Sequence, residues 1–451
     1  MHKVLIANRG EIALRIIKTC QRLGIQTVAV YSEVDVDMPF VKEADEAFLI
    51  GPAQVQQSYL KASDIIEIAI RVGANAIHPG YGLLSENAEF ARQVQQAGMV
   101  FIGPDADTID KMGDKIGSRV TMQTAGVPVV PGTDGGIVSL EEATRAATEI
   151  GYPIMLKASA GGGGIGMVRC ENEQALTHHF ESVKSRAKAY FGDDVVFLEK
   201  FIANARHIEV QIFGDNHGNV VHLYERNCSV QRRNQKVIEE SPSPHLPEEA
   251  RQRLLQAAVN AAKAVGYKNA GTVEFIVDDN NHIYFLEMNT RLQVEHPVTE
   301  QVTGYDLVEW QIEVAKGNEL PVKVQAEIQS MGHAIEFRIY AEDPVKFMPS
   351  PGTIAKLDWG ETADVRIDTG YVEGGKVTPF YDPLISKVIV HAMTRDEAIQ
   401  KSRAFLAQVE IAGLKTNIPL FNEFLTADEF KTGDYTTAVL ATWLEKQKGE
   451  K

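Results

Sequence analysis

The first hundred residues alternate between strand-like and helix-like hydrophobic patterns, and this alternation constrains the fold more than any other feature of the chain. The apolar run Val4–Ala7 is followed by apolar residues at helical spacing from Ile12 to Cys20, and then by a second apolar run, Thr27–Tyr31. Gly24 supplies the stop between this helix and the second strand. One strand–helix–strand unit results, and such units normally build a parallel sheet covered by helices.

The turn after the first strand limits which cofactor this region can bind. It reads Asn8-Arg9-Gly10-Glu11 and lacks the G-x-G-x-x-G pattern that dinucleotide-binding domains carry there. We therefore disfavour a nicotinamide-dependent enzyme. The alternation continues with a helix expected at Asp64–Arg71, a strand at Ala76–His78 and a helix at Ala88–Ala97.

Two further regions follow, each with its own pattern. A helix at Leu140–Ile150 and a strand at Pro153–Lys157 precede a glycine-rich run. Later strands are expected at Ile208–Phe213, Val220–Glu225, Gly271–Val277, Ile283–Glu287, Ala334–Ala341 and Leu384–Val390. A last helix opens on the capping box Thr394–Glu397 and is expected to close at Gly413. Since 451 residues fit about three domains, we predict a multidomain protein of α/β and α+β class.

Charge and cysteine content argue against several partners and environments. The chain has 45 Lys and Arg against 61 Asp and Glu, a net charge of −16, which disfavours nucleic acid and an anionic membrane surface. No apolar run reaches transmembrane length, and Val4–Ala7 is too short for a signal peptide. The three cysteines are widely spaced and suggest neither disulfides nor a zinc site, so we expect a cytoplasmic protein.

The glycine-rich run at residues 160–166 contains four consecutive glycines just after the strand that carries Lys157. Glycines expose a row of backbone N–H groups, and such a loop can close over a polyphosphate. No Gly-Lys-Ser/Thr follows, so this is not a Walker A loop. A flexible surface loop is the alternative, but the lysine at its edge favours phosphate.

Two glutamates form a second signal. Glu274 and Glu287 lie in consecutive strands, and in an antiparallel pair both carboxylates can reach one face of the sheet. Asn289 shares that face because it lies two residues after Glu287. Carboxylate and amide oxygens are hard ligands that suit Mg²⁺ beside substrate phosphates. A pair of solvent-facing strand glutamates is the alternative, which the glycine loop makes less attractive.

Residues 291–297 and 231–236 form the third and fourth signals. Arg291 can bind a planar oxyanion through two hydrogen bonds, and Glu295 can accept a proton if its surroundings hold it close. Beside an ATP–Mg²⁺ site, this pair suggests a small oxyacid that is activated by phosphoryl transfer. The basic segment at residues 231–236 is unusual in so acidic a chain. For residues 291–297, the alternative is a surface arginine and glutamate without a joint role. For residues 231–236, the alternative is a solvated loop.

These motifs, in this order, resemble the ATP-grasp superfamily and, within it, the biotin carboxylases. The resemblance covers essentially residues 1–446 and rests on many short segments. They include Asn8-Arg9-Gly10-Glu11-Ile12-Ala13, His78-Pro79-Gly80-Tyr81-Gly82, Met112-Gly113-Asp114-Lys115, the glycine loop, Glu199-Lys200-Phe201, Arg206-His207-Ile208-Glu209, Cys228-Ser229-Val230-Gln231-Arg232-Arg233, Glu287-Met288-Asn289-Thr290-Arg291, Glu295-His296-Pro297-Val298-Thr299-Glu300 and Arg338 with Ala341-Glu342-Asp343-Pro344.

The resemblance implies three domains. These are an N-terminal Rossmann-like domain at residues 1–113, an ATP-grasp domain at 114–330 with a mobile lid at about 131–203, and a C-terminal biotin carboxylase domain at 331–446.

The resemblance also implies a role for each site residue. The expected ATP contacts are Lys115 and Lys157 on the phosphates, Gly163 and Gly164 in the lid, Glu199, Lys200, Phe201 and Ile202 around the adenine, and His207, Gln231 and Asn234 on the ribose side. The expected ligands of Mg²⁺ or Mn²⁺ are Glu274, Glu287 and Asn289.

The same resemblance assigns the chemistry. Lys236 and Arg291 would hold bicarbonate, with Gln293 and Val294 nearby. Glu295 would deprotonate bicarbonate so that it attacks the γ-phosphate of ATP and gives carboxyphosphate. Arg338 would stabilise the enolate of biotin, and Tyr81 would stand near the biotin.

Several positions depart from the common pattern of the family. They are Ile165, Asn227, Asn234 and Tyr340, and together they suggest a divergent paralogue. The implied reaction is the first half-reaction of an acetyl-CoA or acyl-CoA carboxylase, as in fatty acid biosynthesis. A carboxylate–amine ligase of the same superfamily and a catalytically impaired ATP-binding paralogue are the rival hypotheses.

The expected partners are other protein chains. The sequence contains no Ala/Met-Lys-Met biotinylation site, so we expect a separate biotin carboxyl carrier protein and separate carboxyltransferase subunits. The family suggests a homodimer.

Overall fold

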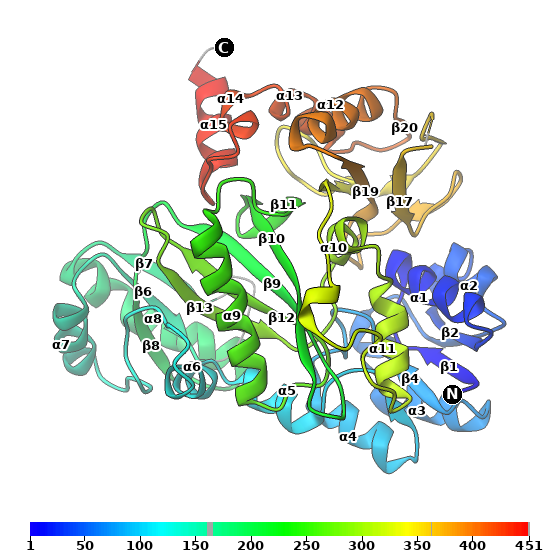
Figure 1. Ribbon diagram of the computed structural model, residues 1–451, viewed down its shortest axis with the longest axis horizontal. Helices are drawn as coiled ribbons and strands as arrows, with labels where there is room; N and C mark the ends of the chain where they lie inside the picture. Colours follow the sequence, from blue (N-terminus) through cyan, green and yellow to red (C-terminus); the bar gives the residue numbers. More distant parts are fainter. Residues whose placement is uncertain (160–165, 362, 450–451) are drawn as a thin grey trace.

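The computed structural model describes residues 1–159, 166–361 and 363–449 (Figure 1). The predicted lid residues Gly163 and Gly164, and the departure at Ile165, lie outside these ranges. Among the described residues, no helix combines the length and the apolar character needed to cross a bilayer.

The N-terminal region forms the predicted parallel sheet, in the order β3-β2-β1-β4-β5. Its strands are β1 (Lys3–Ile6), β2 (Gln26–Ser32), β3 (Glu46–Gly51), β4 (Ala76–His78) and β5 (Val100–Phe101). Its helices are α1 (Gly10–Arg22), α2 (Pro39–Glu43), α3 (Ala62–Arg71), α4 (Ala88–Gln96) and α5 (Ala106–Gly113). The strand order reverses between β1 and β4, and ligands of open parallel sheets bind at the carboxyl ends of strands at such a reversal.

A small antiparallel sheet, β7-β6-β8, follows. It comprises β6 (Ile154–Ala158), β7 (Met167–Cys170) and β8 (Val196–Lys200), preceded by α6 (Lys115–Thr124). Helices α7 (Leu140–Ile150) and α8 (Glu173–Phe191) bury one face of this sheet through apolar residues that include Ala147, Phe180 and Leu198. Figure 1 shows this unit at the edge of the molecule farthest from the N-terminal sheet.

One continuous antiparallel sheet of eight strands forms the centre, in the order β13-β12-β9-β10-β11-β14-β19-β17. Its strands are β9 (Arg206–Gly214), β10 (Val220–Arg232), β11 (Gln235–Ser241), β12 (Asn269–Val277), β13 (Ile283–Asn289), β14 (His333–Tyr340), β17 (Val365–Thr369) and β19 (Leu384–Ala392). Hydrogen bonds between β11 and β14 therefore join the middle region of the chain to its last region.

Helices cover this sheet on both sides. They are α9 (Glu248–Ala264), α10 (His296–Thr303), α11 (Leu307–Ala315), α12 (Arg395–Leu406), α13 (Ile418–Phe424), α14 (Asp428–Lys431) and α15 (Val439–Gly449). Short elements complete the fold: β15 (Gly352–Thr353) with β18 (Lys376–Val377), β16 (Lys356–Asp358) with β20 (Glu410–Ala412), and the 3₁₀ turns Glu33–Asp35, Val55–Gln57 and Gln325–Glu327.

The prediction that Gly413 closes the last capped helix is wrong. The capping box at Thr394 and Glu397 is present, but α12 ends at Leu406. The chain then forms β20, which pairs with β16. Gly413 follows that strand at φ +95°, where a Cβ would lie 2.2 Å from the carbonyl oxygen of Thr353, so close backbone approach explains the glycine.

Candidate active site

A cavity of about 1060 Å³ lies where the N-terminal sheet, the small sheet and the central sheet meet. Its wall includes Asn8–Ile12 and Tyr81–Leu83, which follow β1 and β4 at the reversal of strand order. Most of the predicted site residues that the structure describes also line it: Tyr81, Lys115, Lys157, Glu199, Lys200, Phe201, Ile202, His207, Gln231, Asn234, Lys236, Glu274, Glu287, Asn289, Arg291, Gln293, Val294 and Arg338. Glu295 is the exception, because it is fully buried behind the wall.

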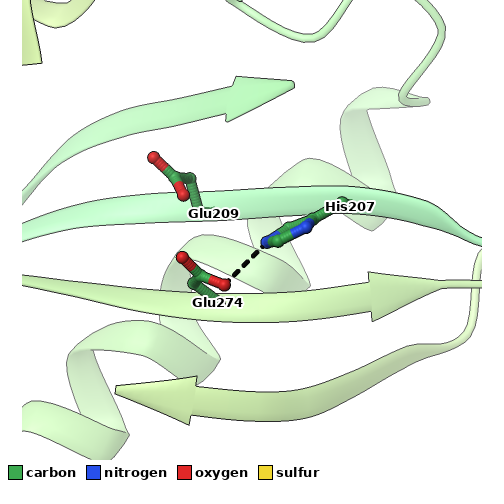
Figure 2. A group of neighbouring side chains, drawn as sticks. All are labelled: His207, Glu209 and Glu274. Atoms are coloured by element: carbon green, nitrogen blue, oxygen red, sulfur yellow. Dashed lines mark hydrogen bonds and ion pairs between the residues drawn. The ribbon is translucent and has the colours of Figure 1, made fainter. Parts of the chain in front are cut away.

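Acidic side chains from neighbouring strands share one face of the central sheet. Glu274 of β12 stands opposite Glu209 of β9 and opposite Glu287 of β13. Figure 2 shows His207 and Glu209 on one strand and Glu274 on the next. His207 Nε2 lies 2.8 Å from Glu274 Oε2. The sequence-based prediction that Glu274 and Glu287 meet on one face is confirmed.

The ammonium group of Lys236 occupies the centre of this acidic cluster. Its Nζ donates to Glu209 Oε2 at 2.6 Å, to Glu274 Oε1 at 2.9 Å and to Glu295 Oε1 at 2.7 Å. Burial disfavours the charged form of Lys236, but the three carboxylates outweigh burial and place its pKa well above the ordinary value. Although the grouping of His207, Glu209 and Glu274 resembles a metal site, a lysine provides the positive charge there.

The predicted metal ligands lie at the cavity end of the same face, where Glu274 already accepts from Lys236 and His207. Burial, and then the charge of Glu274, raise the pKa of Glu287. Two carboxylates that repel each other at a cavity wall suit a cation such as Mg²⁺. Asn289 is placed beside them, donating from Nδ2 to Glu274 Oε1 at 2.9 Å. Its Oδ1 accepts from Arg291 Nη2 at 3.0 Å and would have to leave that bond to bind a metal.

Glu295 lies between two cations. Its Oε1 accepts from Lys236, and its Oε2 accepts from Arg338 Nη2 at 2.9 Å. Burial favours the neutral acid, but Lys236 and Arg338 outweigh burial and hold the pKa of Glu295 well below its usual range. The carboxylate of Glu295 is therefore ionised at neutral pH. It contacts Lys236, which is predicted to hold bicarbonate, and Arg338, which is predicted to stabilise the biotin enolate.

Arg291 is held by a residue that the sequence did not single out. Its Nε donates to Glu86 Oε2 at 2.8 Å, and its Nη1 donates to Gln293 Oε1 at 2.8 Å. Glu86 also accepts from the backbone N–H of Thr290 at 3.0 Å. These contacts fix the guanidinium at the cavity wall, although Glu86 lies more than two hundred residues earlier in the chain.

The predicted phosphate-binding lysines lie on two different elements. Lys115 is the first residue of α6, and Lys157 lies on β6. Burial, with Lys157 nearby, lowers the pKa of Lys115. Lys157 bonds to Glu199 of β8. Arg119, one helical turn after Lys115, also points to Glu199, at 3.4 Å from Oε1, and was not predicted.

The basic segment at residues 231–236 is a β-hairpin whose turn is exposed to solvent. Strand β10 ends at Arg232 and β11 begins at Gln235, so the turn consists of Arg233 and Asn234, both with positive φ. Gln231 Nε2 lies 2.7 Å from His207 Nδ1. The hairpin therefore delivers Gln231, Asn234 and Lys236 to one wall of the cavity.

Tyr81 lies at the cavity wall, and its hydroxyl bonds to Glu11. Glu11 in turn lies 3.2 Å from the buried ammonium of Lys387, which donates to the carbonyl oxygen of Val294 at 2.9 Å. The N-terminal sheet and the central sheet thus meet beside the predicted biotin residue.

The sequence predicted no site role for Glu209 or Glu86, and only Glu209 has a local pattern that could have indicated one. Glu209 belongs to the buried strand β9, in which His207, Glu209 and Gln211 are polar at every second position. That alternation is a signal for one polar face. Glu86 has no such signal, because its contact with Arg291 depends on how distant segments meet.

Family models match nearly the whole chain in three consecutive segments. The biotin carboxylase N-terminal domain matches residues 1–109, the ATP binding domain of the carbamoyl-phosphate synthase L chain matches residues 114–323, and the biotin carboxylase C-terminal domain matches residues 336–442.

Individual relatives agree with these matches. The chain is 57% identical to a biotin carboxylase of Halalkalibacterium halodurans over 99% of both chains. Its structure is similar to a biotin carboxylase–β,γ-ATP complex from Campylobacter jejuni, with a TM-score of 0.95 and 46% identity over 98% of both chains. It is also similar to the biotin carboxylase domain dimer of Hydrogenobacter thermophilus 2-oxoglutarate carboxylase in complex with MgADP, ADP and bicarbonate, with a TM-score of 0.94 and 49% identity over 98% of this chain and 97% of that chain. The chain belongs to the biotin carboxylase family.

Proposed function

We propose that Lys236, Arg291 and Glu295 activate bicarbonate in this enzyme, and that Arg338 acts in the transfer to biotin. The enzyme is an ATP-dependent ligase that carboxylates biotin with bicarbonate and uses Mg²⁺. Bicarbonate would lie between the cations Lys236 and Arg291. Its hydroxyl proton would pass to Glu295, and the carbonate oxygen would attack the γ-phosphorus as the bond to ADP breaks, giving carboxyphosphate and ADP.

The single observation that carries this assignment is the position of Glu295. An ionised carboxylate is buried against Lys236 and Arg338, at 2.7 and 2.9 Å. An anion that binds Lys236 therefore comes within reach of a proton acceptor, and proton transfer requires such proximity. Arg338 would then be free to stabilise the enolate of biotin.

The chain's own side chains prepare the metal and nucleotide positions. Glu274 and Glu287, with Asn289, would hold Mg²⁺, which when bound neutralises charge on the transferring phosphoryl group. Lys115 and Lys157 would bind ATP phosphates. Glu199, Lys200, Phe201 and Ile202 would surround the adenine, and His207, Gln231 and Asn234 would face the ribose, because all of them line the same cavity.

The test compares the wild-type enzyme with Glu295→Gln in assays of ATP binding and of biotin-dependent ATP hydrolysis. We expect the variant to bind ATP normally and to lose about 10²-fold or more of its turnover, because the amide cannot accept the proton. Glu249→Gln, an exposed glutamate of α9, is the matched control and should keep full turnover.

Two outcomes would contradict this proposal. Normal biotin-dependent turnover in Glu295→Gln would remove Glu295 as the base. Tight ATP binding by the wild type without biotin-dependent hydrolysis would favour the impaired paralogue. The carboxylate–amine ligase hypothesis has lost its support, because two of the three family models and the relatives above are biotin carboxylases.

We further propose that the enzyme works as a homodimer in the cytoplasm, with a biotin carboxyl carrier protein and carboxyltransferase subunits as partners. The Hydrogenobacter relative is a dimer of biotin carboxylase domains, and this supports the homodimer. Sedimentation equilibrium of the purified chain tests the oligomeric state, and a fixed monomeric mass at micromolar concentrations would contradict it.

A further inference from the structure

Two carboxyl side chains stand opposite each other behind the active site, and the proposed mechanism uses neither. Glu239 of β11 and Glu336 of β14 are register partners in the central sheet. Both are fully buried. Residues directly opposite on antiparallel strands have their Cβ atoms about 5 Å apart, so the two carboxyl groups face the same small space.

The hydrogen bonds leave three of their four oxygens unused. Glu239 Oε1 accepts a hydrogen bond from Arg338 Nε at 2.6 Å and lies 2.5 Å from Arg338 Nη2 in an ion pair. Glu239 Oε2 and both oxygens of Glu336 are buried without a hydrogen-bond partner among the described residues. A buried carboxylate without any partner is costly, whereas one proton between the two groups satisfies an oxygen on each.

The surroundings favour this single proton. Val298 and Val302 of α10, with Ala334 and Ile389, form an apolar cluster on β14 and β19 beside Glu336. The charged groups that act on the pair are Arg338 on β14, Lys387 on β19, Lys236 on β11 and Glu295 before α10. Burial raises the pKa of Glu336 well above its ordinary value, and burial raises that of Glu239 to about 7 despite Arg338.

We propose that Glu239 and Glu336 share one proton, which Glu336 donates to Glu239 Oε2, and that this pair positions Arg338. The proton fixes the carboxyl group of Glu239, so that its Oε1 holds the guanidinium while Nη2 of Arg338 still reaches Glu295 at 2.9 Å. Glu336 would thus be a positioning residue for the biotin step. This role rests on the proposed role of Arg338.

The test uses Glu336→Gln, which keeps a hydrogen-bond donor of nearly the same shape, and Glu336→Met, which has none. We expect the glutamine variant to keep its KM for biotin within about twofold, and the methionine variant to raise it about tenfold, the loss typical of one hydrogen bond to a charged group. The KM for ATP should stay within about twofold in both, since Arg338 does not serve the nucleotide.

Infrared spectroscopy at neutral pH tests the proton independently of activity. The wild type should show the C=O stretch of a protonated carboxylic acid, and Glu336→Gln should lose it. Glu240→Gln is the matched control: Glu240 is the next residue of β11, and its pKa is lowered to about 2 against the effect of burial by Arg395 and His333, so this variant should keep the band.

Three results would overturn the inference: absence of the band in the wild type, its persistence in Glu336→Gln, or the same KM for biotin in the glutamine and methionine variants. If Glu336→Met does not fold, the spectrum of Glu336→Gln still decides. Loss of the band in Glu336→Gln together with no biotin-dependent turnover in the wild type would refute the proposed function and leave the shared proton standing.

Discussion

Lys236 is the residue on which the acidic face of the central sheet depends. It is the shared hydrogen-bond donor of Glu209, Glu274 and Glu295, and its side chain is only 13% exposed. Three carboxylates at one buried place repel each other, so the cation that joins them stabilises the fold, and in the proposed function the same cation binds bicarbonate.

Replacing Lys236 by methionine tests this double role. We expect the free energy of unfolding to fall by about 3–5 kcal/mol, the cost of leaving buried carboxylates without their cation, and bicarbonate-dependent turnover to be lost. Urea unfolding measures the first effect. Lys268→Met removes an ion pair with Asp105 at the surface, and this control should cost less than about 1 kcal/mol. Equal losses in the two variants would contradict the interpretation.

The lowered pKa of Glu240 predicts how the free energy of unfolding depends on pH. Its carboxylate accepts from His333 at 2.6 Å and from Arg395 at 2.7 Å, and despite burial its pKa is lowered from 4.5 to about 2. A lowered folded-state pKa gives stability that is complete above pH 4.5 and is lost as the pH falls towards 2. The shift corresponds to about 3 kcal/mol.

Glu240→Gln should therefore be less stable than the wild type at neutral pH, and the two free energies of unfolding should converge as the pH falls below about 4.5. Urea titrations at a series of pH values measure both curves. Parallel curves throughout this range would show that Glu240 does not carry this part of the acid sensitivity.

At the scale of elements, the β10–β11 hairpin matters most, because it delivers Gln231, Asn234 and Lys236 to the cavity. Arg232, at the end of β10, forms a two-bonded ion pair with Glu342, with one bond at 2.7 Å, and its guanidinium lies 4.6 Å from the ring centre of Phe347. Both partners follow β14, so this contact ties the hairpin tip to the last region of the chain.

Arg232→Lys removes the two-bonded geometry and the stacking while keeping the charge. We expect kcat/KM for ATP to fall about tenfold, because a lysine cannot hold the hairpin in one position. Steady-state kinetics at saturating bicarbonate measure this. Arg233→Lys changes the exposed arginine of the same turn and should leave kcat/KM within about twofold. A similar fall in both variants would mean that charge alone matters.

At the scale of the whole molecule, Glu300 of α10 joins three regions of the chain. Its carboxylate accepts from Arg15 of α1 at 2.8 Å, from Arg366 of β17 at 2.6 Å and from the backbone N–H of Leu307 at 2.6 Å. The side chain is only 5% exposed. In Figure 1, α10 lies just below β19 and to the left of α1.

Glu300→Gln should destabilise the protein by about 1–3 kcal/mol, because two half-buried arginines lose their shared carboxylate and keep only Asp306 and Asp368 as partners. Differential scanning calorimetry should also show a broader transition, since the N-terminal and C-terminal regions lose a common partner. Glu309→Gln, which breaks only a contact with the half-exposed Arg22, should cost less than about 1 kcal/mol. A sharp, unchanged transition in Glu300→Gln would contradict this coupling.

Local pattern was sufficient where the chemistry depends on neighbours in the sequence. The alternation after Val4 predicted the parallel sheet, and the spacing of Glu274, Glu287 and Asn289 predicted their common face, because strand geometry repeats every two residues. The prediction at Gly413 was wrong because local pattern was not sufficient there. The sequence shows that a glycine ends a pattern, but the pairing of β20 with β16 depends on a distant strand.

The sequence by itself determined the class of fold, the family and the residue types of the site, because backbone periodicity and motif order are local properties. The domain boundaries at residues 113 and 330 and the individual site roles stay predictions. Only the tertiary structure decided that one sheet runs from β13 to β17 and that Glu86 holds Arg291. It also decided that a chain with a net charge of −16 contains a site in which Glu295 lies between the cations Lys236 and Arg338. Those contacts join residues tens to hundreds of positions apart, and their energies come from burial, which no local pattern encodes.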